Sequence, residues 1–313
     1  MYERLIVITR KTRLQELIER FNSRAQAKFY IEHSGGDFSQ YVTEDEAYHG
    51  SLSVLQKSLP KTGLKMQLVA REFVPTFLFT EKDVIVTAGQ DGLVANTAKY
   101  VGAQPIVAVN PDPQRIDGVL LPFEVKQAPV AVAKVLEGKA RVRQVTLAKA
   151  TLNDGQKLLG FNDLFIGASS HISARYKISI DKNSERQSSS GVIVSTGAGS
   201  TGWLSSVFNM AAGIARFADP ARRDTRDSFK RPQLTWEDER LMFVVREPFV
   251  SRQSSAELVA GTLERGHNLS LESLMPSGGV IFSDGIEADY LAFNSGAIAS
   301  IGIADHRAQL VAA

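Results

Sequence analysis

The residue best suited to do chemistry is Asp91, which lies in the stretch DVIVTAGQDGLVANTAK. It is the only ionised side chain in a glycine turn that runs from Gly89 to Gly92. A glycine turn lets backbone N–H groups approach a phosphate, whereas a carboxylate beside a phosphate repels it. The carboxylate is therefore expected to have a functional role, either as a base that takes a proton from an attacking hydroxyl or as a ligand of a metal ion.

The elements around this turn favour a binding site. Residues 83–87 form an apolar run rich in β-branched residues, typical of a buried strand, and residues 93–100 have the spacing of a short helix. In an open parallel sheet, ligands bind beyond the carboxyl ends of the strands. Asp-Gly pairs also form ordinary turns, however, and this chain has three more of them. On the turn alone, a structural role is the favoured interpretation.

Two further stretches carry polar groups suited to a nucleotide. Asn162-Asp163 places an amide beside a carboxylate, and both are directional partners for ribose hydroxyls and an adenine edge. Ser188–Trp203, SSSGVIVSTGAGSTGW, takes a buried strand into a turn of small and hydroxyl residues and then into a helix. The chain lacks GxxxxGK[ST], which excludes a P-loop nucleotidase, and it lacks GxGxxG after the first strand, so the dehydrogenase fingerprint is absent.

The composition is that of a globular protein of two domains, with 313 residues, 43% of them hydrophobic and 22% charged. A formal charge of +2 gives no sign of a nucleic-acid partner. The absence of cysteine excludes disulfides, thiol catalysis and cysteine-type zinc sites, and the five histidines lack metal-ligand spacing. The apolar run at the N-terminus is too short for a membrane span, so a cytoplasmic protein with no membrane partner and no resident metal is expected.

The two halves of the chain differ in how their apolar residues are spaced. Apolar runs at 5–9, 64–69, 83–87 and 105–109 alternate with helical segments and predict an N-terminal Rossmann-like α/β domain with a parallel sheet, residues 1–124. Short alternating runs then predict a C-terminal antiparallel β domain, residues 125–313, with one helix at about 203–216. The basic and polar run at 216–231 is interpreted as a solvated loop.

Taken in order, these motifs resemble those of the NAD kinase family. That family shows Gly-Gly-Asp-Gly, then Asn-Glu, then Thr-x-x-Gly-Ser-Thr, and the similar segments here are Gly89–Gly92, Asn162-Asp163 and Thr196–Thr201. The tail is also similar, at 246–249 and 276–287. Three short segments resemble the mitochondrial-type branch of the family: Thr12-Arg13, Asn110-Pro111-Asp112-Pro113 and Ser189-Ser190-Gly191.

The resemblance implies an enzyme that phosphorylates the 2′-hydroxyl of the adenosine ribose of NAD with ATP, with Mg²⁺ bound to the ATP. Asp91 would be the catalytic residue, and Arg13 could reach a phosphate, although a surface role suits it equally well. The residues implied to bind ATP phosphates are Gly89, Gln90 and Gly92, and those implied to bind NAD are Asn162, Asp163, Ser195, Thr196, Ser200 and Thr201. The family architecture, and the many strand edges of the β domain, also point to a homodimer or a higher homo-oligomer.

The chain departs from the family pattern at two of these positions. Gln90 replaces the second glycine, and Asp163 is one methylene shorter than glutamate. Two alternatives therefore remain open. The first is a lipid or sugar kinase that shares the glycine–aspartate turn. The second is a dinucleotide-binding sensor that has lost phosphoryl transfer because of Gln90.

Overall fold

The computed structural model describes residues 2–218 and 233–313, and the chain divides into two compact units. The first unit comprises Met1–Arg143 and Ala308–Ala313, and the second comprises Gln144–Arg307. The division lies later than the predicted boundary at 124/125, because helix α5 (Ala128–Leu136) packs into the core of the first unit. Most of the predicted basic loop, residues 219–231, lies outside the described part of the chain.

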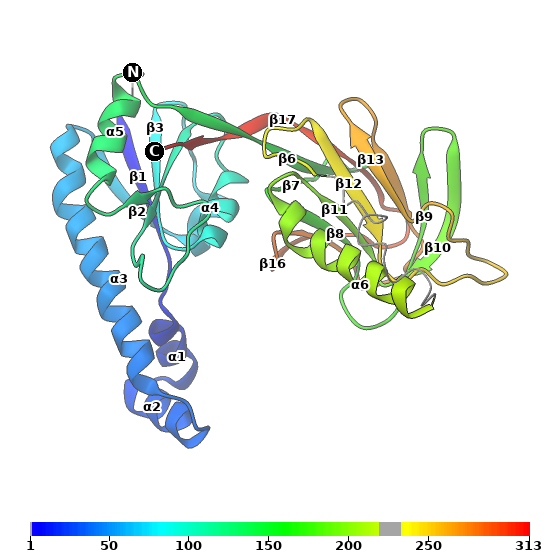
Figure 1. The fold of residues 1–313 in the computed structure, drawn as a ribbon, viewed down its shortest axis with the longest axis horizontal. Helices are drawn as coiled ribbons and strands as arrows, with labels where there is room; N and C mark the ends of the chain where they lie inside the picture. Colours follow the sequence, from blue (N-terminus) through cyan, green and yellow to red (C-terminus); the bar gives the residue numbers. More distant parts are fainter. Residues whose placement is uncertain (1, 219–232) are drawn as a thin grey trace. The chain divides into compact units, whose positions relative to one another are not determined.

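The first unit contains the predicted parallel sheet, and its helices lie on both faces (Figure 1). The order across the sheet is β17-β4-β3-β1-β2, and every neighbouring pair is parallel. The short strand β5 adds to β4. The strands are β1 (Arg4–Thr9), β2 (Lys65–Ala70), β3 (Asp83–Ala88), β4 (Pro105–Asn110), β5 (Phe123–Glu124) and the end of β17 (Ile298–Val311).

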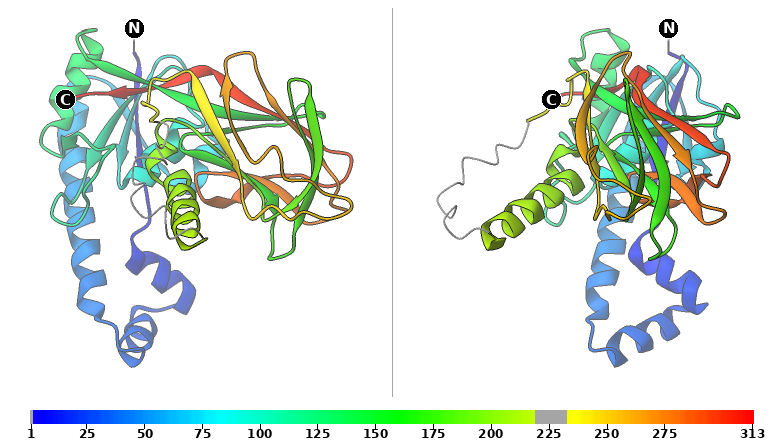
Figure 2. Two further views of the ribbon diagram at one scale, coloured as in Figure 1. Left: turned by 45° about the vertical axis from the view of Figure 1, so that its right-hand side comes forward. Right: turned by 90° about the vertical axis from the view of Figure 1, so that its right-hand side faces the viewer.

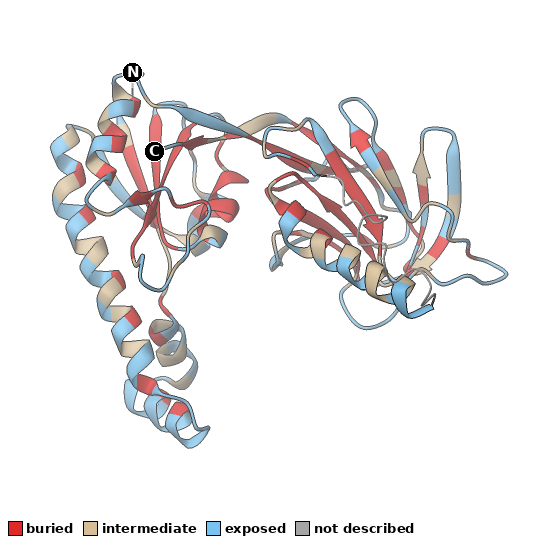
Figure 3. Ribbon diagram, in the orientation of Figure 1, coloured by how far each residue is buried: buried red, intermediate tan, exposed pale blue. Residues whose placement is uncertain are grey.

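Apolar side chains hold the helices of the first unit on this sheet. Leu55, Leu59 and Val132 come from α3, the 3-10 turn η1 and α5, and they pack on one face of β1, β3 and β4. Helix α4 packs on β3 and β4. Figure 3 shows the resulting buried centre. The helical segments are α1 (Arg13–Phe21), α2 (Arg24–His33), α3 (Phe38–Ser58), η1 (Leu59–Thr62), η2 (Arg71–Thr76) and α4 (Asp91–Ala98), besides α5.

Helices α1 and α2 pack on the start of α3 around Leu14, Ile31 and Phe38, apart from the strands of the unit (Figure 2). The sequence pattern predicts a loop at 34–41, yet α3 begins at Phe38. The side chain of Asp37 caps the helix by accepting the N–H of Ser39 at 2.9 Å, and Phe38 is buried. None of the described helices has both the length and the apolar character needed to cross a bilayer.

The second unit contains two β-sheets that face each other across one apolar core. One contains the order β10-β9-β14-β17, with β6 and β7 beside it, and the other, sheet B, is antiparallel with the order β13-β12-β11-β8-β15-β16. The strands and helices are β6 (Val142–Leu152), β7 (Lys157–Gly160), β8 (Asp163–Ala168), β9 (Ala174–Ile180), β10 (Asn183–Ser189), β11 (Val192–Ser195), η3 (Gly199–Thr201), α6 (Trp203–Ala218), β12 (Arg240–Val245), β13 (Ala260–Glu264), β14 (Leu269–Ser273), β15 (Gly279–Ser283) and β16 (Ile286–Ala292).

Alternation along the strands of sheet B separates its two faces. Leu164 and Ile166 of β8 point into the core, whereas Phe165 lies on the outer face. Helix α6 covers part of that outer face, where Leu204 packs on Met242 of β12. The fold is thus an α/β unit and an antiparallel β unit, which confirms the predicted fold class.

Candidate functional site

Asp91 lies at the first residue of α4 rather than in the middle of a turn, and Gln90 is the N-cap residue. A carboxylate in the first turn is stabilised by the partial positive charge of the helix N-terminus. Its oxygens accept the N–H of Val119 at 3.2 Å and that of Leu120 at 2.8 Å. These two bonds fix the carboxylate and leave lone pairs free for a further donor, since an ionised carboxylate can accept about four hydrogen bonds.

The topology of the first unit places this residue at a switch point of the sheet. From β1 the chain continues to β2 on one side, and from β3 it continues to β4 on the other. Because β1 and β3 are neighbours, the crevice beyond their carboxyl ends is the place where open α/β sheets bind ligands. Gln90 and Asp91 follow β3, and Arg10 follows β1.

A cavity of about 280 Å³, here called the basic cavity, opens at these strand ends. Its lining includes three arginines and two carboxylates, so one positive charge is in excess. Burial alone would raise the pKa of Glu44, but hydrogen bonds from Arg13 and Arg10 lower it below the ordinary value. The ionised Glu44 therefore holds both guanidinium groups in place. The residues that define the cavity are Arg10, Arg13, Glu44, Gln90, Asp112 and Arg115.

The predicted phosphate-binding residues differ in how they are held. Gly89 is buried, and a Cβ there would lie 2.7 Å from Cδ2 of Leu93. Gly92 is exposed, with no protein atom within 4 Å of an added Cβ. Gln90 is exposed and lines the basic cavity. Arg13 also lines it and stacks on Tyr41 with 4.8 Å between its Cζ and the ring centroid.

The predicted dinucleotide residues come together in the second unit, where two loops are joined by hydrogen bonds. The carbonyl of Asn162 accepts the N–H of Thr196 at 2.9 Å and its hydroxyl at 3.1 Å. The hydroxyl of Thr196 also donates to the carbonyl of Phe161, and that of Ser200 to the carbonyl of Gly197. These hydroxyls hold the loops in shape. They are less free for a ligand than the sequence suggested.

Glycine makes the close approach of the two loops possible. A Cβ on Gly199 would lie 2.1 Å from the carbonyl oxygen of Asn162, and one on Gly197 would lie 1.7 Å from that of Thr235. Thr201 is exposed, and the side-chain amide of Asn162 is half-buried with no hydrogen-bond partner among the described residues. These two side chains are free to contact a ligand.

Asp284 organises the loop that carries Asn162 and Asp163. Its carboxylate accepts the N–H groups of Phe161 at 3.0 Å, Asn162 at 2.6 Å and Asp163 at 3.3 Å. Its own φ is 53°, a left-handed conformation that aspartate tolerates better than most residues. Asp284-Gly285 is one of the Asp-Gly pairs in the sequence, and the long-range partners of the Asp284 side chain leave no local signal there.

Asp163 is 8% exposed, and its carboxylate has no hydrogen-bond or cationic partner among residues 2–218 and 233–313. Burial, and then the neighbouring charge of Asp284, raise the pKa of Asp163 to about 7. Perturbed carboxylates of this kind are common at functional sites. In the same described ranges no group of three or more histidine, aspartate and glutamate side chains is arranged to hold a metal ion.

Comparison with known proteins gives several relatives of one kind, although no family model matches the chain. Human mitochondrial NAD kinase 2 is 25% identical, over 81% of this chain and 72% of that protein. The Xenopus tropicalis protein of the same name is 23% identical, over 97% and 89%. The NAD kinase of Clostridium kluyveri is 31% identical over a shorter region, 42% of this chain and 46% of that protein.

Solved structures show the same fold. Yeast NADH kinase complexed with NADH matches with a TM-score of 0.60 and 16% identity, over 100% of this chain and 84% of that one. An NAD kinase from Archaeoglobus fulgidus in complex with ATP matches with a TM-score of 0.59 and 14% identity, over 98% and 93%. With the motifs in the same order, these relatives support the NAD kinase family for this chain, and the solved structures share its fold.

Proposed function

We propose that this protein transfers the γ-phosphoryl group of ATP to the 2′-hydroxyl of the adenosine ribose of NAD, giving NADP and ADP. The observation that carries the proposal is the placement of Asp91, whose carboxylate is fixed at a helix N-terminus at the switch point of a parallel sheet. The similar curated proteins bear the names NAD kinase 2 and NAD kinase. Phosphoryl transfer depends mainly on positioning and electrostatics, which such a carboxylate can supply.

The donor's phosphates are assigned to the first unit. The exposed backbone at Gly92 and the amide of Gln90 offer N–H donors at the start of α4. Arg10, Arg13 and Arg115 of the basic cavity supply positive charge close to Gln90. Gln90 lacks the conformational freedom of glycine, but its side chain can donate to a phosphate oxygen.

The dinucleotide is assigned to the second unit. The free amide of Asn162 and the exposed hydroxyl of Thr201 would contact the adenosine end, with Asp163 between hydrogen-bonded loops. Ser195, Thr196 and Ser200 would shape this site mainly through their bonds to backbone carbonyls. The oxygen of the ribose 2′-hydroxyl would attack the γ-phosphorus of ATP, and Asp91 would accept the proton of that hydroxyl. The bond between the γ-phosphorus and the oxygen that bridges it to the β-phosphate would break, which releases ADP.

Mg²⁺ would enter with ATP. The two oxygens of Asp91 already accept two N–H groups, and no acidic cage exists among the described residues, so the nucleotide's phosphates would supply most ligands. The ion would neutralise charge on those phosphates. The cytoplasmic location and the homo-oligomeric state remain predictions.

A set of phosphoryl acceptors distinguishes the proposed function from the two alternatives, a lipid or sugar kinase and a dinucleotide-binding sensor. The protein would be incubated with ATP labelled in the γ-phosphate, Mg²⁺ and, in separate reactions, NAD, a diacylglycerol and a sugar. Label transfer to NAD alone is expected. Transfer to the lipid or the sugar would favour the alternative kinase, and NAD binding without any transfer would favour the sensor.

A substitution at Gly92 tests whether the turn binds phosphate, because an added side chain there would not disturb the packing of the protein. We expect Gly92→Ala to leave the melting temperature unchanged or slightly raised, because no atom lies within 4 Å of the added methyl group and alanine favours a helix more than glycine does. Turnover should nevertheless fall about tenfold, because the methyl group would hold the phosphate away from the backbone N–H groups, a loss of roughly 1.4 kcal/mol. Parent-like turnover would show that no phosphate approaches this residue. Steady-state kinetics with ATP varied measures the effect.

Asp163 makes stability depend on pH in an unusual direction. Its pKa is about 7 in the folded protein and about 3.8 when unfolded, so between these values the folded state binds more protons. Stability from this group is therefore lost as pH rises from about 4 to 7 and does not change above that range. Asp163→Asn should raise the free energy of unfolding by ~2 kcal/mol at pH 8 and have little effect at pH 4. Urea unfolding at both pH values checks this, and an equal effect at both would contradict it.

A further inference from the structure

Helix α3 carries three polar side chains on the side that packs on the first unit (Figure 1). Glu44, Tyr48 and Ser51 are spaced i, i+4 and i+7, so they lie along one side of the helix. Leu55 continues the same side one turn later and is fully buried in the core of the unit. Polar groups on a packed side of a helix need partners within the protein, and each of these three has one.

Tyr48 is the side chain that joins two strands. Its hydroxyl accepts the N–H of Arg10 at 2.9 Å and donates to the carbonyl of Ala88 at 3.1 Å. Arg10 is the first residue after β1, and Ala88 is the last residue of β3, directly before Gly89. Tyr48 is only 2% exposed. Burial raises the pKa of its hydroxyl above the ordinary value, so the hydroxyl keeps its proton and can make both bonds at neutral pH.

The ring of Tyr48 holds the guanidinium group of Arg10 in place. The Cζ of Arg10 lies 5.1 Å from the centroid of this ring, within the range of a cation–π interaction. The same guanidinium donates to the carboxylate of Glu44 at 3.0 Å and to the carbonyl of Lys11 at 2.9 Å. Tyr48 and Arg10 both line the basic cavity. The position of this cation is therefore fixed largely by α3.

Helix α3 also binds the loop that follows β4. The hydroxyl of Ser51 donates to the carbonyl of Pro111 at 2.6 Å. The loop that begins at Pro111 supplies Arg115 to the basic cavity, and two of its later N–H groups hold the carboxylate of Asp91. One side of α3 thus contacts the segments after β1 and β4 and the last residue of β3, which together carry the groups assigned to the donor's phosphates.

We propose that Tyr48 is a positioning residue for phosphoryl transfer. Its hydroxyl fixes the ends of β1 and β3 relative to each other, so that Arg10 and the turn from Gly89 keep the spacing that the donor's phosphates require. The inference rests on the proposed function, because it takes ATP to be the ligand of the first unit. A group that is misplaced by about 1 Å can lower a rate about a hundredfold, so such a fixed spacing matters for turnover.

Tyr48→Phe tests the proposal, because it removes the hydroxyl and keeps the ring that holds Arg10. We expect kcat for NADP formation to fall about tenfold, since the turn and the strand end are no longer joined. Binding of inorganic tripolyphosphate, measured by calorimetry on the full chain, should weaken about three- to tenfold. The affinity for NAD should stay within about twofold of the parent value, because Tyr48 contacts none of the predicted dinucleotide residues.

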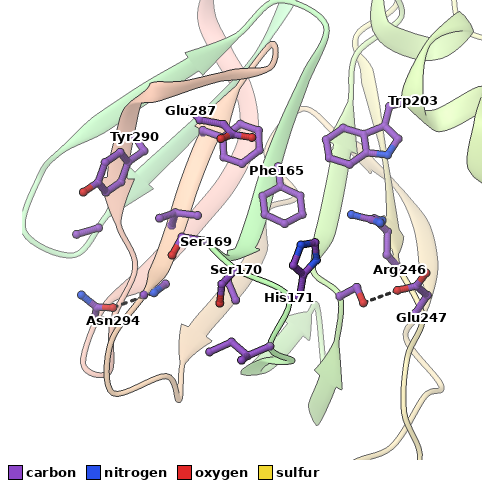
Figure 4. A pocket seen from close by; sticks show the side chains of 18 residues that line it. Phe165, Ser169, Ser170, His171, Trp203, Arg246, Glu247, Glu287, Tyr290 and Asn294 are labelled. Carbon is purple, nitrogen blue, oxygen red and sulfur yellow. Dashed lines mark hydrogen bonds between the residues drawn. The ribbon is translucent and has the colours of Figure 1, made fainter.

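Tyr176→Phe is the matched control, because it also removes a buried hydroxyl with two partners. That hydroxyl donates to Oε1 of Gln187 at 3.0 Å and lies 2.7 Å from Oγ of Ser189. Tyr176 belongs to the core of the second unit. It lines neither the basic cavity nor the cavity of about 890 Å³ beside Trp203 (Figure 4). At saturating NAD we expect this variant to keep kcat and tripolyphosphate binding within about twofold of the parent values.

Thermal unfolding monitored by circular dichroism shows whether both variants are folded at the assay temperature. Parent-like kcat and tripolyphosphate binding in Tyr48→Phe would overturn the proposal, and so would equal losses in Tyr176→Phe. A Tyr48→Phe protein that does not fold would also overturn it, because the hydroxyl would then be needed for the fold itself. Failure of the proposed function looks different: the parent forms no NADP, but its binding of tripolyphosphate still weakens in Tyr48→Phe.

Discussion

Asp91→Asn is expected to lower the rate of NADP formation at least a hundredfold. Asparagine keeps the size of the side chain but cannot take a proton from the ribose hydroxyl, and general-base catalysis is typically worth about a hundred- to ten-thousandfold. The structure adds a second effect. The new NH₂ group would face the N–H of Val119 or Leu120, so one hydrogen bond is lost at a cost of about 1–2 kcal/mol of stability.

Asn110→Ala separates these two effects. The amide of Asn110 anchors the same loop by donating to the carbonyl of Ile116 at 2.9 Å and accepting the N–H of Asp112 at 3.0 Å, without contacting Asp91. We expect this variant to lose a similar amount of stability and less than tenfold in turnover. If Asp91→Asn kept more than about a tenth of the parent turnover, the barrier would have changed by less than ~1.4 kcal/mol, too little for a lost base.

Gly199→Ala is expected to destabilise the second unit strongly, although it adds only one methyl group. The added Cβ would lie 2.1 Å from the carbonyl oxygen of Asn162 and 2.8 Å from Oγ of Ser195. That carbonyl accepts bonds from Thr196 and belongs to the backbone, so it cannot rotate aside as a side chain would. Overpacking usually costs about 1–3 kcal/mol, and a backbone clash should reach about 3 kcal/mol or more.

Gly213→Ala is the matched control, because Gly213 lies in α6 with no atom within 4 Å of an added Cβ. It should be neutral, or stabilising by up to about 1 kcal/mol, since alanine favours a helix more than glycine does. Denaturant unfolding monitored by circular dichroism compares the stability of the two variants, and calorimetry measures their affinity for NAD. Equal stability of both variants would show that the two loops are not in the close contact described.

The fold could be predicted from the sequence because its signals are local. Apolar runs rich in β-branched residues marked β1, β3 and β4, and the break after Ala88 located the start of α4. The place of α5 in the first unit leaves no local pattern, because only its packing against the strands assigns it there. The return of β17 to β4 was equally invisible, since pairing between residues about two hundred positions apart leaves no local pattern.

The candidate site could be predicted only in part. As with the fold, local patterns were visible in the sequence and contacts between distant residues were not. Residue types and motif order predict Asp91, Asn162 and Thr201 as site residues, and their roles stay predictions. Contacts made across the fold were not predictable, including the bonds from Val119 and Leu120 to Asp91 and those from three backbone N–H groups to Asp284. They also show that several predicted ligand hydroxyls are used within the protein.

Formation of NADP by the purified 313-residue chain is the measurement that tests the central claim most directly. NAD, ATP and Mg²⁺ would be supplied together, and NADP would be read continuously through a dehydrogenase that accepts only NADP. We expect a rate that requires both NAD and ATP and that falls at least a hundredfold in Asp91→Asn while Asn110→Ala stays within tenfold of the parent. Saturable NAD binding by calorimetry with no NADP formed would contradict the claim and leave a dinucleotide-binding protein without phosphoryl transfer.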